Sequence, residues 1–98
     1  MKLSHIQSIL SVAKSGSLRG ASRVSGVAQP AMTRSIREVE RELGVALFER
    51  HAKGAKLTAM GEAFVRRAKL VDAEIQRIYD EIEQLKGRST GRISVAFS

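Results

Sequence analysis

Hydrophobic residues in the first half of the chain recur at steps of three and four, the spacing of an amphipathic helix. This pattern predicts a first helix from about Lys2 to Lys14 and a second from Leu18 to about Val24, with the Ser17 hydroxyl as the second helix's N-terminal cap. The apolar positions expected to be buried are Leu3, Ile6, Leu10 and Ala13, flanked by Ile9 and Val12, in the first helix and Leu18, Ala21 and Val24 in the second.

A third helix is predicted from Gln29 to Leu43, directly after a turn that contains Gly26. Pro30 suits its first turn, because proline lacks an N–H group and has a fixed φ. Two helices joined by a short turn within residues 18–43 are typical of a helix-turn-helix. The stripe that this third helix is expected to bury consists of Met32, Ile36, Val39 and Leu43.

The helical spacing stops at Gly44, and a different pattern follows. Two short segments, 47–50 and 56–58, flank a polar turn that contains Gly54. Such flanks around a glycine-bearing turn predict a small β-hairpin.

A long helix is predicted from Ala59 to about Lys86, with Thr58 as its cap and Glu62 in its first turn. At 1.5 Å per residue it spans on the order of 40 Å. That length exceeds the width of a compact body of 58 residues, which favours a coiled-coil-like contact with a second chain over packing on its own domain alone. The strict heptad seam expected to make this dimer contact consists of Phe64, Ala68, Val71, Ile75, Ile78, Ile82 and Leu85.

The chain after this helix alternates apolar and polar residues. Residues 87–91 contain two glycines and are expected to break the helix as a hinge, and residues 92–98 have the alternation of a strand. A single strand has nothing to pair with here, so we expect it to be the first strand of a further domain. The predicted organisation is a helix-turn-helix domain with a hairpin in 1–58, a linker and dimerisation helix in 59–87, and a hinge with that strand in 88–98.

Charge divides the chain at the same place as the hydrophobic pattern. Residues 1–58 contain ten Lys or Arg and four Glu, a net charge of +6, whereas residues 59–88 contain six basic and six acidic residues. A basic first part is expected of a surface that meets a polyanion. Aromatic residues make up only 4% of the chain, which argues against base stacking on single strands.

The residue types needed for catalysis or metal binding do not occur in a useful arrangement. The chain has no cysteine, and His5 and His51 are too far apart in sequence to show metal-ligand spacing. No carboxylate pair, Ser/His/Asp set or phosphate-binding glycine loop stands out. We therefore expect no enzyme and no cofactor, and the absence of a long apolar run predicts a protein that does not enter a membrane.

One face of the third helix has the chemistry of base recognition. At about 100° per residue, its polar and basic side chains share roughly 140° of the helix, apart from the apolar stripe. Glutamine suits adenine, arginine suits guanine, and a threonine hydroxyl or methyl suits several bases. Entry into the groove with the N-terminus first would keep most carboxylates away from phosphate. The residues on this face are Gln29, Pro30, Thr33, Arg34, Arg37 and Arg41, and the carboxylates are those of Glu38, Glu40 and Glu42.

Further basic residues surround this helix in the sequence. Arg50, Lys53 and Lys56 flank or occupy the hairpin turn, where they are expected to contact phosphate or a minor groove. Contacts to the DNA backbone are expected from Ser17, Arg19, Arg23 and Arg37.

Taken in order, these segments resemble the amino-terminal domain of LysR-type transcriptional regulators, and the resemblance covers essentially the whole chain. After the first helix comes the stretch GSLRGASRVSGVAQPAMTRSIREVERELGVALFER, followed by the hairpin. The stretch LTAMGEAF then leads into the long helix. Its most specific pieces are Gln29-Pro30-Ala31, the Ile36 to Leu43-Gly44 segment, Leu47-Phe48-Glu49-Arg50, and Leu57-Thr58 with Gly61.

The resemblance implies a mainly α-helical fold, a winged helix-turn-helix with a long linker helix that pairs antiparallel with its twin. It also implies base or groove contacts by Gln29, Pro30, Thr33 and Arg34 and a wing contact by Lys53. The implied partners are a partly palindromic double-stranded DNA with a T…A core, a second copy in a homodimer that forms tetramers in the full-length protein, and RNA polymerase. The resemblance also implies a carboxy-terminal domain of periplasmic-binding-protein type, missing here, that would bind a small-molecule effector. The protein would act in the bacterial cytoplasm.

Some positions depart from the pattern of that family. Ala28 occupies a position where Ser or Thr usually caps the third helix, a cap worth about 0.5–2 kcal/mol. Thr33 replaces a usual Ser, and Lys53 replaces an Arg whose bidentate geometry lysine lacks. Gly20 replaces a commoner Ala.

Two other functions fit a winged helix in principle. A module that binds a protein partner would show exposed apolar anchors on the third helix, and its polar face offers none. An RNA-binding role is disfavoured because an α-helix cannot enter the narrow major groove of A-form RNA.

Overall fold

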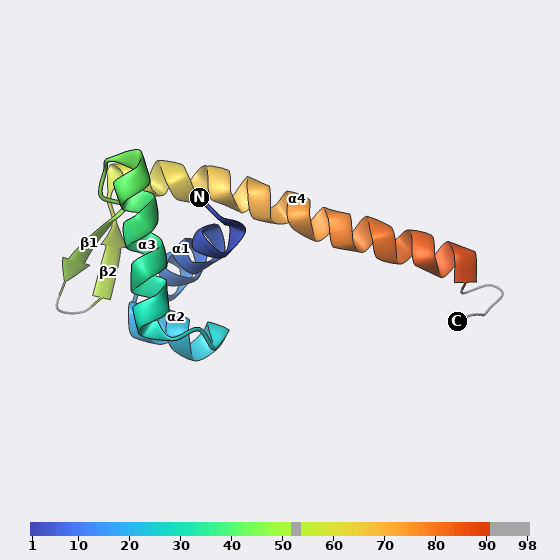
Figure 1. The fold of residues 1–98 in the computed structure, drawn as a ribbon, viewed down its shortest axis with the longest axis horizontal. Helices are drawn as coiled ribbons and strands as arrows, with labels where there is room; N and C mark the ends of the chain where they lie inside the picture. The colour runs from blue at the N-terminus through green and yellow to red at the C-terminus, as the bar shows by residue number, and fades with distance from the viewer. Residues whose placement is uncertain (52–53, 91–98) are drawn as a thin grey trace.

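The computed structural model describes residues 1–51 and 54–90, which form a small helical body and a protruding helix (Figure 1). The predicted order of three helices, a hairpin and a long helix is confirmed. The elements are α1 (Leu3–Ser15), α2 (Leu18–Ser25), α3 (Gln29–Leu43), β1 (Phe48–His51), β2 (Gly54–Leu57) and α4 (Ala59–Thr90).

The hydrophobic core lies between α1, α2 and α3 and is closed by β1 and the start of α4. In α1 the fully buried residues are Ile9 and Val12, whereas Leu3 lies at the exposed edge of the stripe. The expected burial of Val24 is wrong, since this side chain is 83% exposed. It lies in the last turn of α2, beyond the part of that helix that the body covers. The core residues are Ile9, Val12, Ala21, Met32, Ile36, Val39, Leu47, Phe48 and Val65.

The predicted caps mark the starts of two helices. Ser17 Oγ accepts a hydrogen bond from the N–H of Gly20 at 3.0 Å, and Thr58 Oγ1 accepts one from the N–H of Gly61 at 3.0 Å. Ala28 precedes α3 in an extended conformation and supplies no side-chain cap, as its methyl group requires. The starts of α2 and α4 therefore each have a hydroxyl cap, whereas the start of α3 has no side-chain cap.

Two glycines allow the hairpin and α4 to approach the body closely. Gly54 has a φ of 147° and lies against the carbonyl oxygen of Gly16, which also accepts the N–H of Ala55 at 3.0 Å. Gly61 lies against the carbonyl oxygen of Leu47. A side chain at either glycine would collide with that backbone, so both positions require the smallest residue.

The hairpin is antiparallel, and Phe48 lies opposite Leu57 at its base. Its far end pairs His51 with Gly54. Lys53 in the turn lies outside the described residues. The base of the hairpin thus joins the core through Phe48, and its far end contacts the body at Gly54, which lies against Gly16.

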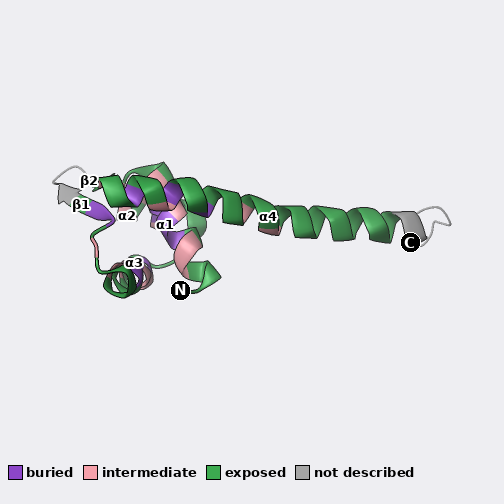
Figure 2. Cartoon of the chain, turned by 90° about the horizontal axis from the view of Figure 1, so that it is seen from above, coloured by how far each residue is buried: buried purple, intermediate pink, exposed green. Residues whose placement is uncertain are grey.

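The long helix has two parts with different surroundings (Figure 2). Its first turns pack on α1 and β2 and bury Val65 and Ala68, whereas every residue from Gln76 to Gly87 is exposed. The predicted heptad seam is therefore divided. Ala68 is only 4% exposed and Phe64 is partly buried in its own body, while Val71, Ile78, Ile82 and Leu85 face solvent.

The predicted end of the long helix is wrong. We expected a break at residues 87–91, but α4 continues through Gly87 to Thr90. Gly87 is not among the glycines with positive φ. A glycine costs a helix only about 1 kcal/mol relative to alanine, which is too little to end a helix of this length. The predicted strand at residues 92–98 lies outside the described residues, as does the rest of the hinge from Gly91.

Candidate nucleic-acid interface

The third helix presents its polar face to solvent and its apolar face to the core. Met32, Ile36 and Val39 are buried, whereas the side chains of the predicted reading face are exposed, apart from Thr33, which is half-buried. The separation of the two faces predicted from the sequence is therefore present, but the expected burial of Leu43 is wrong, since this residue at the last position of α3 is 45% exposed. The exposed members are Gln29, Pro30, Arg34, Arg37 and Arg41.

The entry of α3 is fixed by two serines of α2. Ser22 Oγ donates a hydrogen bond to the carbonyl oxygen of Val27 at 2.6 Å, and the N–H of Val27 donates to Ser25 Oγ at 3.2 Å. These bonds hold the turn on both sides of Gly26, immediately before the helix whose own cap position is an alanine. We did not assign a role to either serine from the sequence, where the Ser-x-x-Ser-Gly spacing was the available signal.

All three carboxylates of α3 turn toward groups of the protein itself. Glu38 Oε1 lies 3.0 Å from His5 Nε2, and Glu42 Oε1 lies 3.0 Å from the amino group of Met1. Glu40 Oε2 accepts the backbone N–H of Leu47 at 2.7 Å and of Phe48 at 3.3 Å. Each carboxylate thus has a partner within the protein, although the side chains of Glu38 and Glu42 remain 45% and 53% exposed. The order of residues alone did not predict these partners.

His5 is oriented by bonds on both ring nitrogens. The backbone N–H of Lys2 donates to Nδ1 at 3.1 Å, so Nδ1 acts as the acceptor. Nε2 then carries the proton that faces Glu38. This histidine joins α1 to α3, and its contacts are structural.

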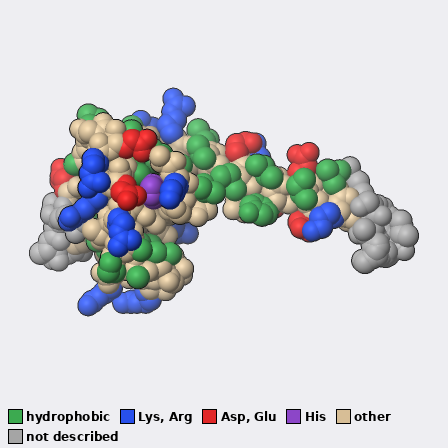
Figure 3. Space-filling view, viewed as in Figure 1, with side chains coloured by type: hydrophobic (Ala, Val, Ile, Leu, Met, Phe, Trp, Pro, Cys, Tyr) green, Lys and Arg blue, Asp and Glu red, His purple; other side chains and the backbone are tan. Residues whose placement is uncertain are grey.

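The remaining predicted contact residues lie around α3. Arg19 and Arg23 are exposed on α2, and Lys56 is exposed on β2. Ser17 is half-buried and uses its hydroxyl to cap α2. Arg50 belongs to β1, but its side chain, like Lys53, lies outside what the structure describes. Figure 3 shows Lys and Arg side chains gathered over the end of the body that holds α2 and α3.

The arrangement offers hydrogen-bond donors rather than catalytic groups. Amide, hydroxyl and guanidinium groups line one exposed helix face, and an α-helix fits the major groove of B-form DNA, which is about 12 Å wide. Within residues 1–51 and 54–90 there is no group of three His, Cys, Asp or Glu residues that could hold a metal ion. No helix in the described ranges is long and apolar enough to cross a membrane.

Residues 3–62 match the model of the family described as bacterial regulatory helix-turn-helix protein, lysR family. The chain belongs to this family. It is therefore part of a LysR-type transcriptional regulator and not of an enzyme, as the sequence predicted.

Curated LysR-type relatives support this assignment. The chain is 35% identical to the HTH-type transcriptional regulator PcaQ of Agrobacterium fabrum over 89 residues, which cover 91% of this chain and 29% of that protein. It is 40% identical over 91 residues to a probable nitrogen assimilation transcriptional activator of Synechococcus elongatus, covering 92% of this chain and 29% of that protein. The chain thus spans less than a third of the length of these relatives.

Solved structures of LysR-type proteins share the fold. A CbnR_DBD-DNA complex superposes with a TM-score of 0.79 at 31% identity and covers 88% of this chain and 99% of that chain. A complex of BenM_DBD with catB site 1 DNA gives a TM-score of 0.82 at 27% identity, covering 88% and 97%. The predicted winged helix-turn-helix fold is therefore confirmed, with the β1–β2 hairpin as the wing, and the chain is a LysR-type DNA-binding domain.

Proposed function

We propose that this LysR-type domain reads double-stranded DNA by inserting α3 into the major groove, N-terminus first. The single observation that carries this proposal is the composition of the α3 surface. Its exposed face holds amide and guanidinium groups, while Glu38, Glu40 and Glu42 are paired with groups of the protein. A helix with this distribution of charge can approach phosphates closely without repulsion from its own carboxylates.

Sequence recognition is assigned to the first turns of α3. Gln29 and Arg34 supply donors that suit the edges of adenine and guanine, and Thr33 supplies a hydroxyl and a methyl group. Pro30 lies exposed in the first turn, next to Gln29, at the point where the helix would enter the groove. Each good bidentate pair contributes about 1–3 kcal/mol of discrimination against a wrong base.

Contacts that position the domain are assigned to the surrounding basic residues. They bind phosphates, so they set affinity and its salt dependence and carry no sequence information. The Ser17 oxygen already accepts the Gly20 N–H, so this residue can contribute only by donating its hydroxyl proton to a phosphate. The residues of this group are Ser17, Arg19, Arg23 and Arg37, with Arg50, Lys53 and Lys56 of the wing at the backbone or the minor groove.

We further propose that α4 joins two copies of this chain, so that two recognition helices read a partly palindromic operator with a T…A core. The exposed apolar residues Val71, Ile78, Ile82 and Leu85 support this proposal, because a soluble rod with an apolar stripe needs a partner. In this scheme residues 1–58 bind DNA, α4 dimerises, and residues beyond it lead to an effector-binding domain.

Two of the similar solved structures are complexes with DNA, which supports the partner proposed for this chain. The curated relatives are much longer and are transcriptional regulators. For the whole protein we therefore propose a bacterial cytoplasmic regulator that forms tetramers, contacts RNA polymerase and responds to a small-molecule effector.

The test is fluorescence anisotropy of the 98-residue chain on a duplex with a T…A palindrome and on a scrambled duplex, each across a salt series. Binding at least ten times tighter to the palindrome, with affinity that falls steeply as salt rises, is the expected result. Absence of binding to either duplex at low salt would overturn the proposal.

A further inference from the structure

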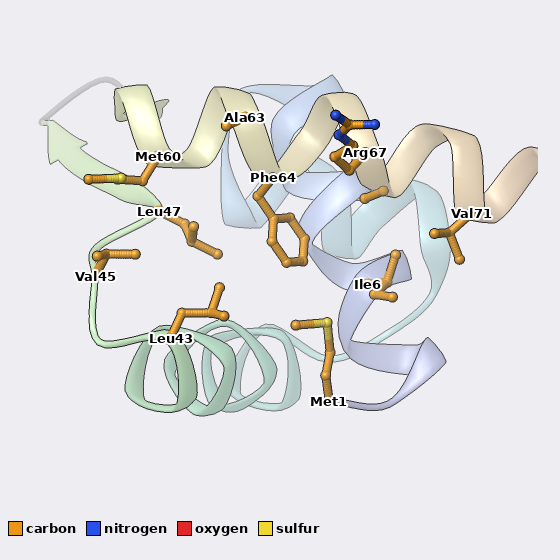
Figure 4. A pocket seen from close by; sticks show the side chains of 11 residues that line it. Met1, Ile6, Leu43, Val45, Leu47, Met60, Ala63, Phe64, Arg67 and Val71 are labelled. Carbon is orange, nitrogen blue, oxygen red and sulfur yellow. The ribbon is translucent and has the colours of Figure 1, made fainter.

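The amino-terminal entry of α3 has no apolar anchor of its own. The middle of this helix is buried at Met32 and Ile36, and its last residue, Leu43, is turned into an apolar groove between α3 and α4 (Figure 4). At the other end, Val27 is 39% exposed, and residues 28–30 are exposed as well. Apolar packing therefore fixes α3 from Met32 onward and leaves its entry to hydrogen bonds.

The side chains that make these hydrogen bonds come from the preceding helix. Ser22 Oγ donates to the Val27 carbonyl at 2.6 Å, and the Val27 N–H donates to Ser25 Oγ at 3.2 Å. Both backbone groups of one residue are thereby held from α2, which is anchored in the core at the fully buried Ala21. We call this arrangement of Ser22, Ser25 and the Val27 backbone the serine clamp.

The serine clamp spans a turn that contains a glycine. Gly26 ends α2 with a φ of 78°, and no group beyond its chain neighbours lies within 4 Å of the position that a side chain would occupy there. Glycine adopts more backbone conformations than any other residue, so an unrestrained Gly26 would let the direction of α3 vary. The serine clamp restrains the residue directly after this glycine, two positions before α3 begins.

The serine clamp stands in place of the side-chain cap that α3 lacks. In α2 and α4 a hydroxyl accepts the N–H of the third helical residue. In α3 the corresponding N–H, that of Ala31, donates to the Ala28 carbonyl at 3.1 Å, and Pro30 before it has no N–H. The cap residue of α3 therefore supplies no side-chain restraint, and the restraint comes from α2 instead.

We propose that Ser22 and Ser25 are positioning residues for DNA recognition and act through the Val27 backbone. This inference rests on the proposed insertion of α3 into the major groove and names residues of α2 on which that insertion depends. Gln29 lies two residues beyond Val27, so a change at the serine clamp shifts the amide and guanidinium groups of the first turns relative to base edges.

The serine clamp is expected to affect sequence recognition more than general affinity. A hydrogen bond to a base edge depends on distance and angle and weakens steeply when the angle is poor. Phosphate contacts from long, flexible side chains depend less on the direction of a helix, and they carry no sequence information. Loss of the serine clamp should therefore lower the preference for one sequence and leave binding to unrelated DNA nearly unchanged.

The first experiment measures amide hydrogen exchange by NMR in Ser25→Ala and in the control Ser4→Ala. Ser25→Ala removes the acceptor of the Val27 N–H, so exchange of this amide should accelerate about fivefold, the effect of one net hydrogen bond. Amides in the middle of α3 should keep their rates, because Ile36 stays buried. Ser4 is exposed in the first turn of α1, so its variant should change neither rate. An unchanged Val27 rate in Ser25→Ala would overturn the serine clamp.

The second experiment measures recognition by fluorescence anisotropy. The probe is the duplex that the unmodified chain enriches most from a random pool, and it is compared with a scrambled version of itself. Ser22→Ala should lower the ratio of the two association constants about fivefold, mainly through weaker binding to the enriched duplex. Ser22→Thr retains the hydroxyl and should keep the ratio of the unmodified chain, as should Ser4→Ala.

A third variant tests whether the serine clamp replaces a cap. Ala28→Ser supplies a hydroxyl that can accept the Ala31 N–H. It should restore most of the ratio lost in Ser22→Ala and change the ratio of the unmodified chain little, a non-additive result. A new hydroxyl that only bound phosphate would raise affinity for both duplexes and leave the ratio as low as in Ser22→Ala, which would contradict the replacement.

The outcomes separate this inference from the function on which it rests. A Ser22→Ala chain that is less stable but keeps the full ratio would make the serine purely structural and overturn the inference, while leaving DNA recognition intact. An equal loss of affinity for both duplexes would also overturn it, because Ser22 would then serve general binding. If the unmodified chain enriches no duplex at all, the proposed function fails, and the inference fails with it.

Discussion

Glu40 Oε2 accepts the backbone N–H of Leu47 at 2.7 Å, so a side chain of the recognition helix holds the start of the wing. The same oxygen also accepts the N–H of Phe48 at 3.3 Å. The third helix and the wing are therefore joined by a charged group and not only by the loop between them. Hydrogen bonds to a charged group stabilise a fold more than neutral ones do.

Glu40→Gln should lower the free energy of unfolding, since it removes the charge that these two N–H groups face. Since the glutamine carbonyl can still accept, the expected loss is the difference between a charged and a neutral hydrogen bond, about 1 kcal/mol for each of the two bonds, measured by urea denaturation. Because the wing moves with this contact, affinity should also fall on specific and scrambled DNA alike. Glu42→Gln is the control, since its partner is an exposed amino group and such pairs contribute about 0–1 kcal/mol. Equal losses for the two variants would contradict the special role of Glu40.

Arg34→Ala and Lys56→Ala should weaken DNA binding in different ways. Arg34 lies on the exposed first half of α3, so its removal should reduce the preference for the operator by about 1–3 kcal/mol. Lys56 lies on β2, and its removal should weaken binding to all duplexes. The slope of the logarithm of the binding constant against the logarithm of the salt concentration should fall in magnitude by about one. Anisotropy on matched and scrambled duplexes checks both effects. An equal loss for Arg34→Ala on the two duplexes would remove it from the base-reading group.

Ile78→Asp should convert the proposed dimer to a monomer without unfolding the domain. Ile78 is 61% exposed in the single chain, so the charge is tolerated there, but a dimer interface would bury it unpaired. Sedimentation velocity together with circular dichroism measures the two properties. Asp80→Asn on the opposite side of α4 is the control and should remain dimeric. A persistent Ile78→Asp dimer would contradict the use of this stripe.

Gly61→Ala and Gly87→Ala lie in the same helix and should shift stability in opposite directions. A methyl group at Gly61 would collide with the Leu47 carbonyl, so we expect a loss of at least about 1–3 kcal/mol. At Gly87 nothing lies within 4 Å of the added methyl, and alanine favours the helix by up to about 1 kcal/mol. Thermal unfolding, monitored by circular dichroism, measures whether each variant is less or more stable than the unmodified chain. An unchanged stability for Gly61→Ala would show that α4 can move away from the Leu47 carbonyl.

Residue spacing was sufficient to predict the elements and much of the candidate site. Apolar steps of three and four located α1, α2 and α3, and hydroxyl residues identified the caps at Ser17 and Thr58. The exposed face of α3 followed from helical projection because helix geometry is local. The base contacts themselves remain predictions.

Features that depend on distant parts of the chain were not predictable in this way. Val24 has the spacing of a core residue, yet the body ends before it. Gly87 has the composition of a break, yet a single glycine does not stop α4. The partners of Glu38 and Glu40 lie in α1 and at residues 47 and 48, where β1 begins, so their roles depend on tertiary packing that the spacing of α3 does not contain.

Because α4 has no break at Gly87, it is one continuous helix from Ala59 to Thr90 and can act as a rigid arm. Its inner turns are fixed in the core at Ala68, and its last described turn ends at Thr90. At 1.5 Å per residue these points are about 33 Å apart, so a tilt of about 10° at the body displaces the far end by about 6 Å. Because α4 is continuous, a small movement at its carboxy-terminal end is transmitted to the DNA-binding domain at its amino-terminal end.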